Sequence, residues 1–314
     1  MTRPLIFAAL LVLAGGCGLA RSTALGVFYD RADLPDENVR RDLAYLPDGL
    51  DKHRLDLFLP LADSVRQRPW PVLVFVHGGG WTEGDRAFEY GGEDLYGNVG
   101  RFFAGRGVGT AVISYRLLPG AVWQDQVADV AAALAWVQDH AAGWGGDPEA
   151  VAVMVHSAGG QLAARVALDG EARRRAGARP VCAAAIVSGA ALDLTDAATW
   201  EAGASFSYYA ARFSPTREPV ESAPPTPFDW QREASPATYA GPDAPPFVLV
   251  TASGESDTFR LQADALARAL RAENVAVERA EMPALSHELG VPNLSRDDRV
   301  VGPAVLDLVR RSCR

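Results

Sequence analysis

Ser157 lies where an apolar run ends and a helical pattern begins, in the stretch VMVHSAGGQ (153–161). A G-x-S-x-G turn between a strand and a helix exposes a serine hydroxyl and supplies the nucleophile of covalent acyl transfer. Gly159 provides the second glycine of this pattern, but Val155 stands where the first glycine is usual. We expect Ser157 to be a nucleophile, with a helix N-cap as the alternative. We also expect the branched side chain of Val155 to press on neighbouring backbone.

Acyl transfer also needs hydrogen-bond donors for an oxyanion. The motif HGGGW (77–81) directly follows the apolar run PVLVFV, and consecutive glycines leave backbone N–H groups unobstructed. The motif is therefore the candidate source of oxyanion donors, and the N–H of Ala158, at the start of a predicted helix, would add another. A glycine run alone is usually a flexible turn. A strand, then HGGGW, then HSAGG further along is a more specific pattern.

His287 is the candidate base among five histidines. His77 and His156 belong to the two motifs. His53 precedes the first predicted strand, and His140 ends a predicted helix whose other face is solvated. His287 follows the last predicted strand, in PALSHELG, where the loop should return to the carboxyl edge of the sheet. Elimination and position therefore favour His287 as the base.

The acid that orients the base is expected at the end of a strand, between the serine and the histidine. The stretch FVLVTASGESDTF offers Asp257, with Glu255 as a rival. We favour Asp257 because it opens the following helix, although it could serve only as the N-cap of that helix. The resulting chain order Ser, Asp, His is the order of an α/β-hydrolase.

Strand-length apolar runs alternate with helical patterns, which predicts an α/β fold with a mainly parallel central sheet flanked by helices. The predicted strands cover 54–60, 71–78, 109–115, 150–156, 182–189, 246–254 and 275–282. The predicted helices cover 123–143, 159–177, 257–275 and about 298–312. Several strands are continuously apolar, as strands buried on both faces must be. The first, RLDLFLP, alternates, so we expect an edge strand with one solvated face.

Residues 192–245 break this rhythm and are rich in proline and large aromatic residues. Because disordered linkers are poor in aromatic residues, we interpret the segment as an ordered, lid-like insertion that forms a pocket wall. A surface loop that packs its own aromatic residues is the alternative.

Length and composition predict one globular α/β domain from residue 21 to residue 314. The formal net charge of -9 argues against a nucleic-acid-binding protein, because phosphate binding needs basic patches.

The first 20 residues, MTRPLIFAALLVLAGGCGLA, place one arginine before an apolar run and then small residues. The run is short for a membrane span and fits a secretory signal peptide, with an uncleaved anchor as the alternative. Cys17 stands in a sequence that resembles a lipoprotein box, so lipid on Cys17 could attach the chain to a membrane. We expect an exported protein, either periplasmic, a cell-envelope lipoprotein or secreted. Cys182 and Cys313 would then be a disulfide or two unrelated thiols.

Together these motifs resemble those of the α/β-hydrolase esterases with an H-G-G-G motif, a group that includes hormone-sensitive-lipase-like and BD-FAE-like carboxylesterases. The resemblance runs from about Asp42 to the C-terminus. It rests on LAYLPDGLDKHRLDLFLP, VFVHGGGWTEGDR, ISYRLLPG, DVAAALAWVQDHAAGWGGDPEAVAVMVHSAGGQLA and SPATYAGPDAPPFVLVTASGESD.

The resemblance implies a serine carboxylesterase that uses neither a metal nor an organic cofactor. It implies a catalytic triad of Ser157, Asp257 and His287, with oxyanion donors at Gly79, Gly80 and Ala158. We expect small or medium acyl esters as substrates, and an exported location favours esters such as acylated sugars. HGGGW also resembles the H-G-G-x-W of arylformamidases, which makes an amide hydrolase the alternative enzyme. A catalytically impaired scaffold used for binding is the non-enzymatic alternative, suggested by Val155.

Overall fold

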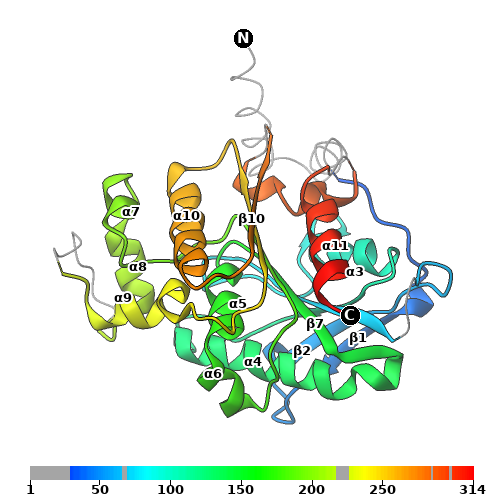
Figure 1. Ribbon diagram of the computed structural model, residues 1–314. Coiled ribbons are helices and arrows are strands. Elements are labelled where there is room, and N and C mark those ends of the chain that lie inside the picture. The colour runs from blue at the N-terminus through cyan, green and yellow to red at the C-terminus, as the bar shows by residue number, and fades with distance from the viewer. Residues whose placement is uncertain (1–28, 66–68, 217–225, 284–285, 297–298) are drawn as a thin grey trace.

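The computed structural model describes residues 29–65, 69–216, 226–283, 286–296 and 299–314. The expected signal peptide and Cys17 lie outside these residues. Helices cover both faces of a mostly parallel eight-stranded sheet (Figure 1). In spatial order the strands are β1 (Val39–Ala44), β2 (Arg54–Phe58), β6 (Gly109–Ile113), β3 (Trp70–Val76), β7 (Gly146–His156), β8 (Ala184–Val187), β9 (Phe247–Ala252) and β10 (Val277–Met282). The pairs β1–β2 and β2–β6 are antiparallel, and the remaining pairs are parallel.

The expectation that β2 is an edge strand with a solvated face is wrong. β2 lies between β1 and β6, and its polar residue Asp56 is only 1% exposed. Arg41 and Arg86 contact the carboxylate of Asp56, so arginines rather than water compensate its charge. The edge strand is β1, in which residues 40–42 are exposed.

The side chains of the sheet alternate between two hydrophobic layers. The helices α4 (Trp123–His140), α5 (Gly159–Leu168) and α10 (Asp257–Ala272) pack on one face, and α3 (Leu95–Ala104) and α11 (Val301–Ser312) pack on the other (Figure 1). Within β7, Val153 and Val155 enter the first layer, whereas Ala152 and Met154 enter the second. Burial on both faces explains why these strands are continuously apolar.

Some elements differ from the sequence prediction. The predicted helix 159–177 is two helices, α5 and α6 (Gly170–Ala176), because the side chain of Asp169 accepts the N–H groups of Glu171 and Ala172 and caps α6. The hairpin of β4 (Glu89–Tyr90) and β5 (Glu93–Asp94) and the helix α3 were not predicted. Short 3-10 turns are η1 (Asp36–Asn38), η2 (Asp51–His53), η3 (Ala141–Trp144), η4 (Pro236–Tyr239), η5 (His287–Leu289) and η6 (Pro292–Ser295).

The described part of segment 192–245 is ordered and carries α7 (Ala197–Glu201), α8 (Phe206–Phe213) and α9 (Asp229–Ala234), which lie beside α10 and α5 at one side of the molecule (Figure 1). Its aromatic residues pack against one another and against the HGGGW motif. The ring centroid of Phe213 lies 4.8 Å from that of Trp81. The segment is therefore both self-packed and joined to the loop that follows β3.

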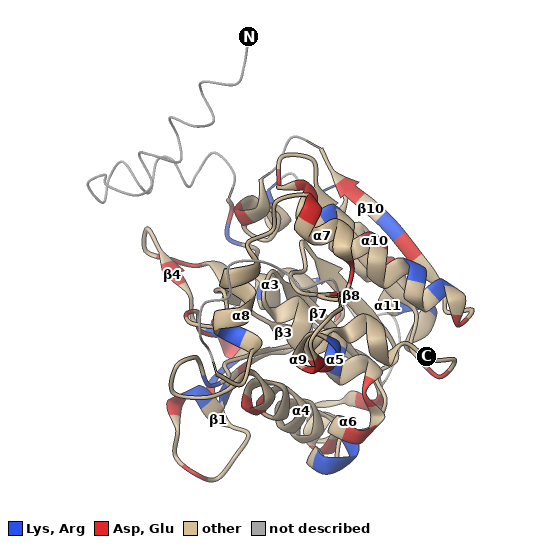
Figure 2. Cartoon of the chain, turned by 90° about the vertical axis from the view of Figure 1, so that its left-hand side faces the viewer, with Lys and Arg blue, Asp and Glu red and all other residues tan. Residues whose placement is uncertain are grey.

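The opposite edge of the sheet is charged. β10 carries Glu278, Arg279 and Glu281, and Figure 2 shows acidic and basic residues along this strand. Charged side chains on an edge strand disfavour pairing with another sheet.

Cys182, before β8, and Cys313, after α11, form a disulfide with a Cα–Cα distance of 5.2 Å. Within the described residues, none of the helices has the length and apolar character needed to cross a membrane.

Candidate active site

Ser157 occupies the turn between β7, which ends at His156, and α5, which begins at Gly159. Its φ of 54° lies in the left-handed region, which few residues other than glycine adopt. The hydroxyl Oγ of Ser157 lies 2.8 Å from Nε2 of His287. Ser157 is not the N-cap of α5, because that position belongs to Ala158. The structure thus brings together the predicted nucleophile and the predicted base.

The turn requires glycine at position 159. A Cβ atom on Gly159 would lie 2.6 Å from the carbonyl oxygen of Val76 and 2.7 Å from that of His77. Both oxygens belong to backbone at the end of β3, so a side chain would force the strand and α5 apart. Gly159 therefore allows the end of β3 and α5 to lie close together.

Val155 fits the strand without backbone strain. It pairs with Val76 of β3 and Ile186 of β8, and its side chain is buried in the hydrophobic layer on the α5 side of the sheet. The positive φ of this segment falls on Ser157 and not on Val155. The turn at Ser157 therefore forms although valine occupies the position where the first glycine is usual.

His287 is held from several sides. Its Nδ1 lies 3.4 Å from Oε2 of Glu255, and its ring stacks on Phe259 with centroids 4.2 Å apart. Its backbone carbonyl accepts a hydrogen bond from Nε2 of His156 at 2.9 Å. Burial, together with the neighbouring His287, lowers the pKa of His156 to about 3. His156 is therefore neutral near pH 7 and serves as a hydrogen-bond donor that fixes the His287 loop.

The carboxylate beside His287 belongs to Glu255, and the choice of Asp257 is corrected by the structure. The Glu255 side chain is 1% exposed, and its Oε1 accepts the N–H of Ala252 at 3.0 Å, which leaves Oε2 facing the imidazole. Asp257 is the first residue of α10, and its side chain is 66% exposed and pairs with Arg260. The N-cap of α10 is Ser256, so Asp257 does not fill that role either.

The candidate oxyanion donors have no acceptor within the described chain. No hydrogen bond there uses the backbone N–H of Gly79, Gly80 or Ala158. Gly79 and Gly80 have positive φ values of 110° and 57°, and both line the same pocket as Ser157. Backbone N–H groups that line the pocket near the Ser157 turn, without an acceptor among the described residues, match the requirement for stabilising an oxyanion.

The loop that follows β3, residues 77–86, is called the glycine loop. Hydrogen bonds to its carbonyl groups explain why the N–H groups of Gly79 and Gly80 have no acceptor among the described residues. The Gly78 carbonyl accepts a hydrogen bond from Nδ1 of His77 at 2.6 Å. The Gly79 carbonyl accepts the N–H groups of Thr82 and Glu83 at 3.1 and 3.0 Å. In a trans peptide the carbonyl and the next N–H point in opposite directions, so the N–H groups of residues 79 and 80 point away from these partners.

His77 is the buried support of this loop. Its ring stacks on that of Tyr115 with centroids 4.3 Å apart. Burial lowers the pKa of His77 to about 4, so the ring is neutral near pH 7 and can donate from Nδ1. These contacts give His77 a structural role in the motif.

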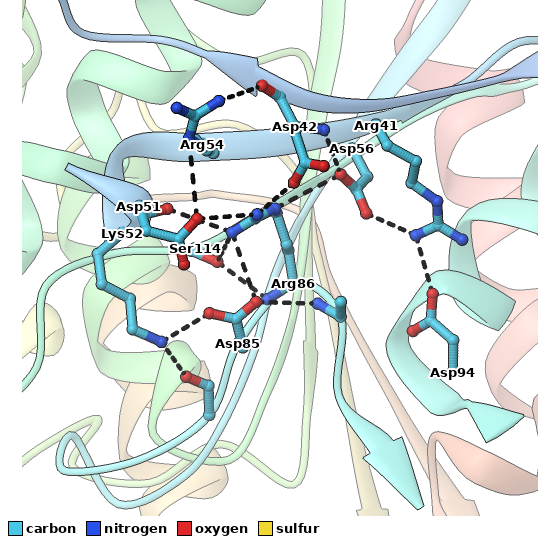
Figure 3. A network of polar contacts seen from close by, with 12 residues as sticks. Arg41, Asp42, Asp51, Lys52, Arg54, Asp56, Asp85, Arg86, Asp94 and Ser114 are labelled. Atoms are coloured by element: carbon cyan, nitrogen blue, oxygen red, sulfur yellow. Dashed lines mark hydrogen bonds and ion pairs between the residues drawn. The ribbon is translucent and has the colours of Figure 1, made fainter. Parts of the chain in front are cut away.

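Arg86, at the end of the glycine loop, forms ion pairs with Asp42 of β1 and Asp56 of β2 (Figure 3). Its guanidinium is 7% exposed and contacts four carboxylates, those of Asp42, Asp51, Asp56 and Asp85. Lys52 reaches the same loop, with Nζ 2.8 Å from the Gly84 carbonyl. The sequence alone does not predict this network, because its members are scattered along β1, η2, β2 and the loop.

A pocket of about 560 Å³ lies over Ser157 and His287. Its walls combine apolar and aromatic side chains with three charged ones. The lining includes Thr82, Glu83, Phe88, Tyr90, Leu95, Tyr96, Tyr208, Arg212, Glu288, Leu289 and Pro292. Tyr208 and Arg212 come from α8, so segment 192–245 forms a pocket wall as expected. Across the described residues, no three His, Cys, Asp or Glu side chains are grouped as a metal ion would need.

A comparison with known families identifies residues 55–270 as a BD-FAE domain, which covers more than half of the chain. The chain belongs to the BD-FAE family. Ser157 and Glu255 lie inside the matched residues of this BD-FAE protein, and His287 lies beyond them.

Curated relatives match part of the BD-FAE protein. The probable isoprenylcysteine alpha-carbonyl methylesterase ICME of Oryza sativa subsp. japonica is 33% identical over 126 residues, 40% of this chain and 28% of the relative. Carboxylesterase NlhH of Mycobacterium tuberculosis is 35% identical over 136 residues, 43% of this chain and 39% of the relative. The chain thus spans less than half the length of either relative.

Solved structures share the whole fold. Esterase B from Lactobacillus rhamnosis superposes with a TM-score of 0.69 at 23% identity, covering 98% of this chain and 93% of the other. A bacterial heroin esterase superposes with a TM-score of 0.68 at 24% identity, covering 99% and 98%. These likenesses establish the α/β-hydrolase fold.

Proposed function

We propose that this BD-FAE protein is a serine carboxylesterase that cleaves small or medium acyl esters, acylated sugars among them. The observation that carries the proposal is the 2.8 Å contact between Oγ of Ser157 and Nε2 of His287 beneath the pocket. Family membership and relatives that are themselves named carboxylesterase and methylesterase support the same chemistry.

In the proposed mechanism, His287 takes the proton of Ser157 while Oγ attacks the acyl carbonyl. The N–H groups of Gly79, Gly80 and Ala158 stabilise the negative charge on the former carbonyl oxygen. Glu255 holds the Nδ1–H tautomer and stabilises the imidazolium that forms. His287 then protonates the leaving alcohol. Water, activated by the same histidine, hydrolyses the acyl-enzyme and releases the acid and free Ser157.

The pocket suits this substrate range. Its volume of about 560 Å³ falls among ordinary small-molecule sites. Phe88 and Tyr208 are both 39% exposed and offer flat apolar surfaces at the mouth of the site.

The test is hydrolysis of p-nitrophenyl acetate, butyrate and octanoate by the wild type and by Ser157→Ala, together with labelling of Ser157 by a fluorophosphonate. We expect activity and labelling in the wild type and neither in the variant. Labelling of Ser157 without ester hydrolysis, but with cleavage of an aryl formamide, would instead support the arylformamidase alternative. A folded wild type that neither labels nor hydrolyses would support the binding scaffold.

We also propose that the protein is exported, because the Cys182–Cys313 disulfide persists in oxidising compartments. Membrane attachment through lipid on Cys17 belongs to the same proposal. Metabolic labelling with palmitate should mark the wild type and not Cys17→Ser. Export would be contradicted if the protein were found in the cytoplasmic fraction and if Cys182 and Cys313 were both free thiols.

A further inference from the structure

Arg212 on α8 places a guanidinium in the pocket beside the glycine loop. Its Nε donates to the Gly80 carbonyl at 3.0 Å, and its Nη1 donates to the Tyr208 carbonyl at 3.0 Å. The guanidinium carbon lies 3.5 Å from the centre of the Tyr208 ring. No carboxylate of the described residues pairs with it within 4.0 Å. The cation is therefore held in one orientation, and Nη2 has no partner among the residues that the structure describes.

Because the Arg212 guanidinium is held in place and still has an available donor at Nη2, it can bind a carboxylate ligand. Arginine stays charged at every physiological pH, and its planar donors match the geometry of a carboxylate. Because three contacts already fix the Arg212 side chain, a ligand would not have to order it. Since no carboxylate of the described residues pairs with Arg212, its full positive charge is available to a ligand in the pocket.

Tyr208 adds a second donor to the same wall. Its hydroxyl lies 2.8 Å from the point where a Cβ on Gly80 would be, so it is directly against the glycine loop. No partner for this hydroxyl is found among the described residues. The α8 wall therefore presents a cation and a hydroxyl next to the candidate oxyanion donors.

The acidic residues of the pocket lie on other elements. Glu288 belongs to η5 and accepts a hydrogen bond from the Ser286 hydroxyl. Glu83 lies in the glycine loop near Tyr96, where its charge contributes to the raised pKa of that tyrosine. A negatively charged group on the substrate is therefore attracted at the α8 wall and repelled near Glu83 and Glu288.

We propose that Arg212, assisted by Tyr208, selects esters that carry a carboxylate in addition to the scissile ester group. The substrate carboxylate binds Nη2 of Arg212 and the Tyr208 hydroxyl while the ester carbonyl faces the N–H groups of Gly79 and Gly80. This inference rests on the proposed esterase function and names the substrate class of that site.

The experiment compares matched pairs of esters that differ in one carboxylate. Monomethyl adipate is paired with methyl hexanoate for the acyl side. 4-Butyryloxybenzoate is paired with its methyl ester for the alcohol side. The measured quantity is the charged-to-neutral ratio of kcat/KM within each pair. We expect a wild-type ratio above one in at least one pair. We expect Arg212→Gln to lower that ratio about 10- to 100-fold through KM, and Tyr208→Phe to lower it less.

Arg106 provides a matched control. It stacks over the Phe102 ring four residues earlier, at 3.7 Å, and its Nη1 donates to the Phe102 carbonyl at 3.0 Å. This repeats the local geometry of Arg212 and Tyr208 at a site that does not line the pocket. Arg106→Gln should leave both the ratio and the activity at wild-type values.

Two results would overturn the inference. One is a wild-type ratio of one or below in both pairs. The other is an Arg212→Gln variant that loses activity equally on charged and neutral esters, since that would mean Arg212 only positions the Gly80 peptide. Increasing salt should also reduce the wild-type preference and leave the ratio of Arg212→Gln unchanged. Neutral esters that the wild type hydrolyses and Ser157→Ala does not would leave the esterase function standing even if this inference fails. No hydrolysis of any ester would remove both.

Discussion

Oε2 of Glu255 lies 3.4 Å from Nδ1 of His287, although Asp257 carries another carboxylate two residues further along the chain. The N–H of Ala252 holds the Glu255 carboxylate against the end of β9. Ser256 then caps α10, and Asp257 begins the helix on its solvent side. The turn between β9 and α10 therefore decides which carboxylate reaches His287.

We predict that Glu255→Gln lowers kcat about 10³- to 10⁴-fold, because an amide cannot stabilise the imidazolium or select the correct tautomer. Asp257→Asn is the matched control and should remain near the wild type, since its side chain pairs only with Arg260 at the surface. The measurement is kcat with p-nitrophenyl butyrate. A large loss in Asp257→Asn with normal activity in Glu255→Gln would reverse this assignment.

We predict that Val155→Gly does not improve the enzyme, although it restores the usual motif. Val155 is fully buried, so the substitution removes core packing and adds backbone freedom to the unfolded chain. Urea unfolding should show a loss of about 3 kcal/mol. Val153→Gly, in the same strand and the same hydrophobic layer, should lose a similar amount. A tenfold rise in kcat for Val155→Gly would show instead that valine strains the turn at Ser157.

Stability should fall in mildly acidic solution because two histidines are buried as neutral rings. Burial lowers the pKa of His77 to about 4 and that of His156 to about 3, from 6.5 in the unfolded chain. Below pH 6.5 the unfolded chain binds protons at these positions and the folded chain does not. The free energy of unfolding is therefore highest above pH 6.5 and decreases toward pH 4, by up to about 1.4 kcal/mol per pH unit for each ring.

Urea unfolding at pH 7, 6 and 5 measures this dependence. NMR of the folded protein should show two imidazole rings whose signals do not titrate down to pH 5. Constant stability across this range, or titration of all five histidines near pH 6.5, would contradict the prediction.

Arg86→Met should destabilise the protein by about 3 kcal/mol, because it leaves the buried Asp56 carboxylate with one cation fewer. Arg54→Met is the control on the same network. Its side chain is 33% exposed, and its pair with Asp51 is long at 3.7 Å, so we expect a change below about 1 kcal/mol. Chemical denaturation measures both. Equal unfolding midpoints for Arg86→Met and the wild type would show that the network of Figure 3 adds nothing to stability.

The sequence predicts the elements whose burial is uniform. β3 and β9 are buried throughout, and β7 is buried from Ala150 to His156, so their apolar runs are unambiguous. β2 was misassigned because Asp56 gives it an alternating pattern, and a sequence does not show that arginines from β1 and the glycine loop bind this residue. α3 was missed because glycines weaken its helical signal. A Cβ on Gly100 would lie 2.1 Å from the Phe58 ring, so packing against β2 requires that glycine.

The candidate site divides in the same way. Ser157 and the glycine loop were found because each motif is a continuous local stretch. The carboxylate beside His287 was not, because the turn after β9 directs Glu255 toward His287 and Asp257 toward solvent. The position of Arg212 in the pocket could not be predicted, since it depends on how α8 contacts the Gly80 carbonyl across the fold.

The bond between Cys182 and Cys313 has a topological consequence for the site. It closes a covalent ring that contains Glu255 and His287, while Ser157 lies outside the ring. A protease that cuts a single peptide bond inside this ring would leave one covalent molecule, with His287 and Ser157 still in the same molecule. Only a reductant would then release the C-terminal fragment, so the nicked enzyme would migrate as two pieces on a reducing gel and as one on a non-reducing gel.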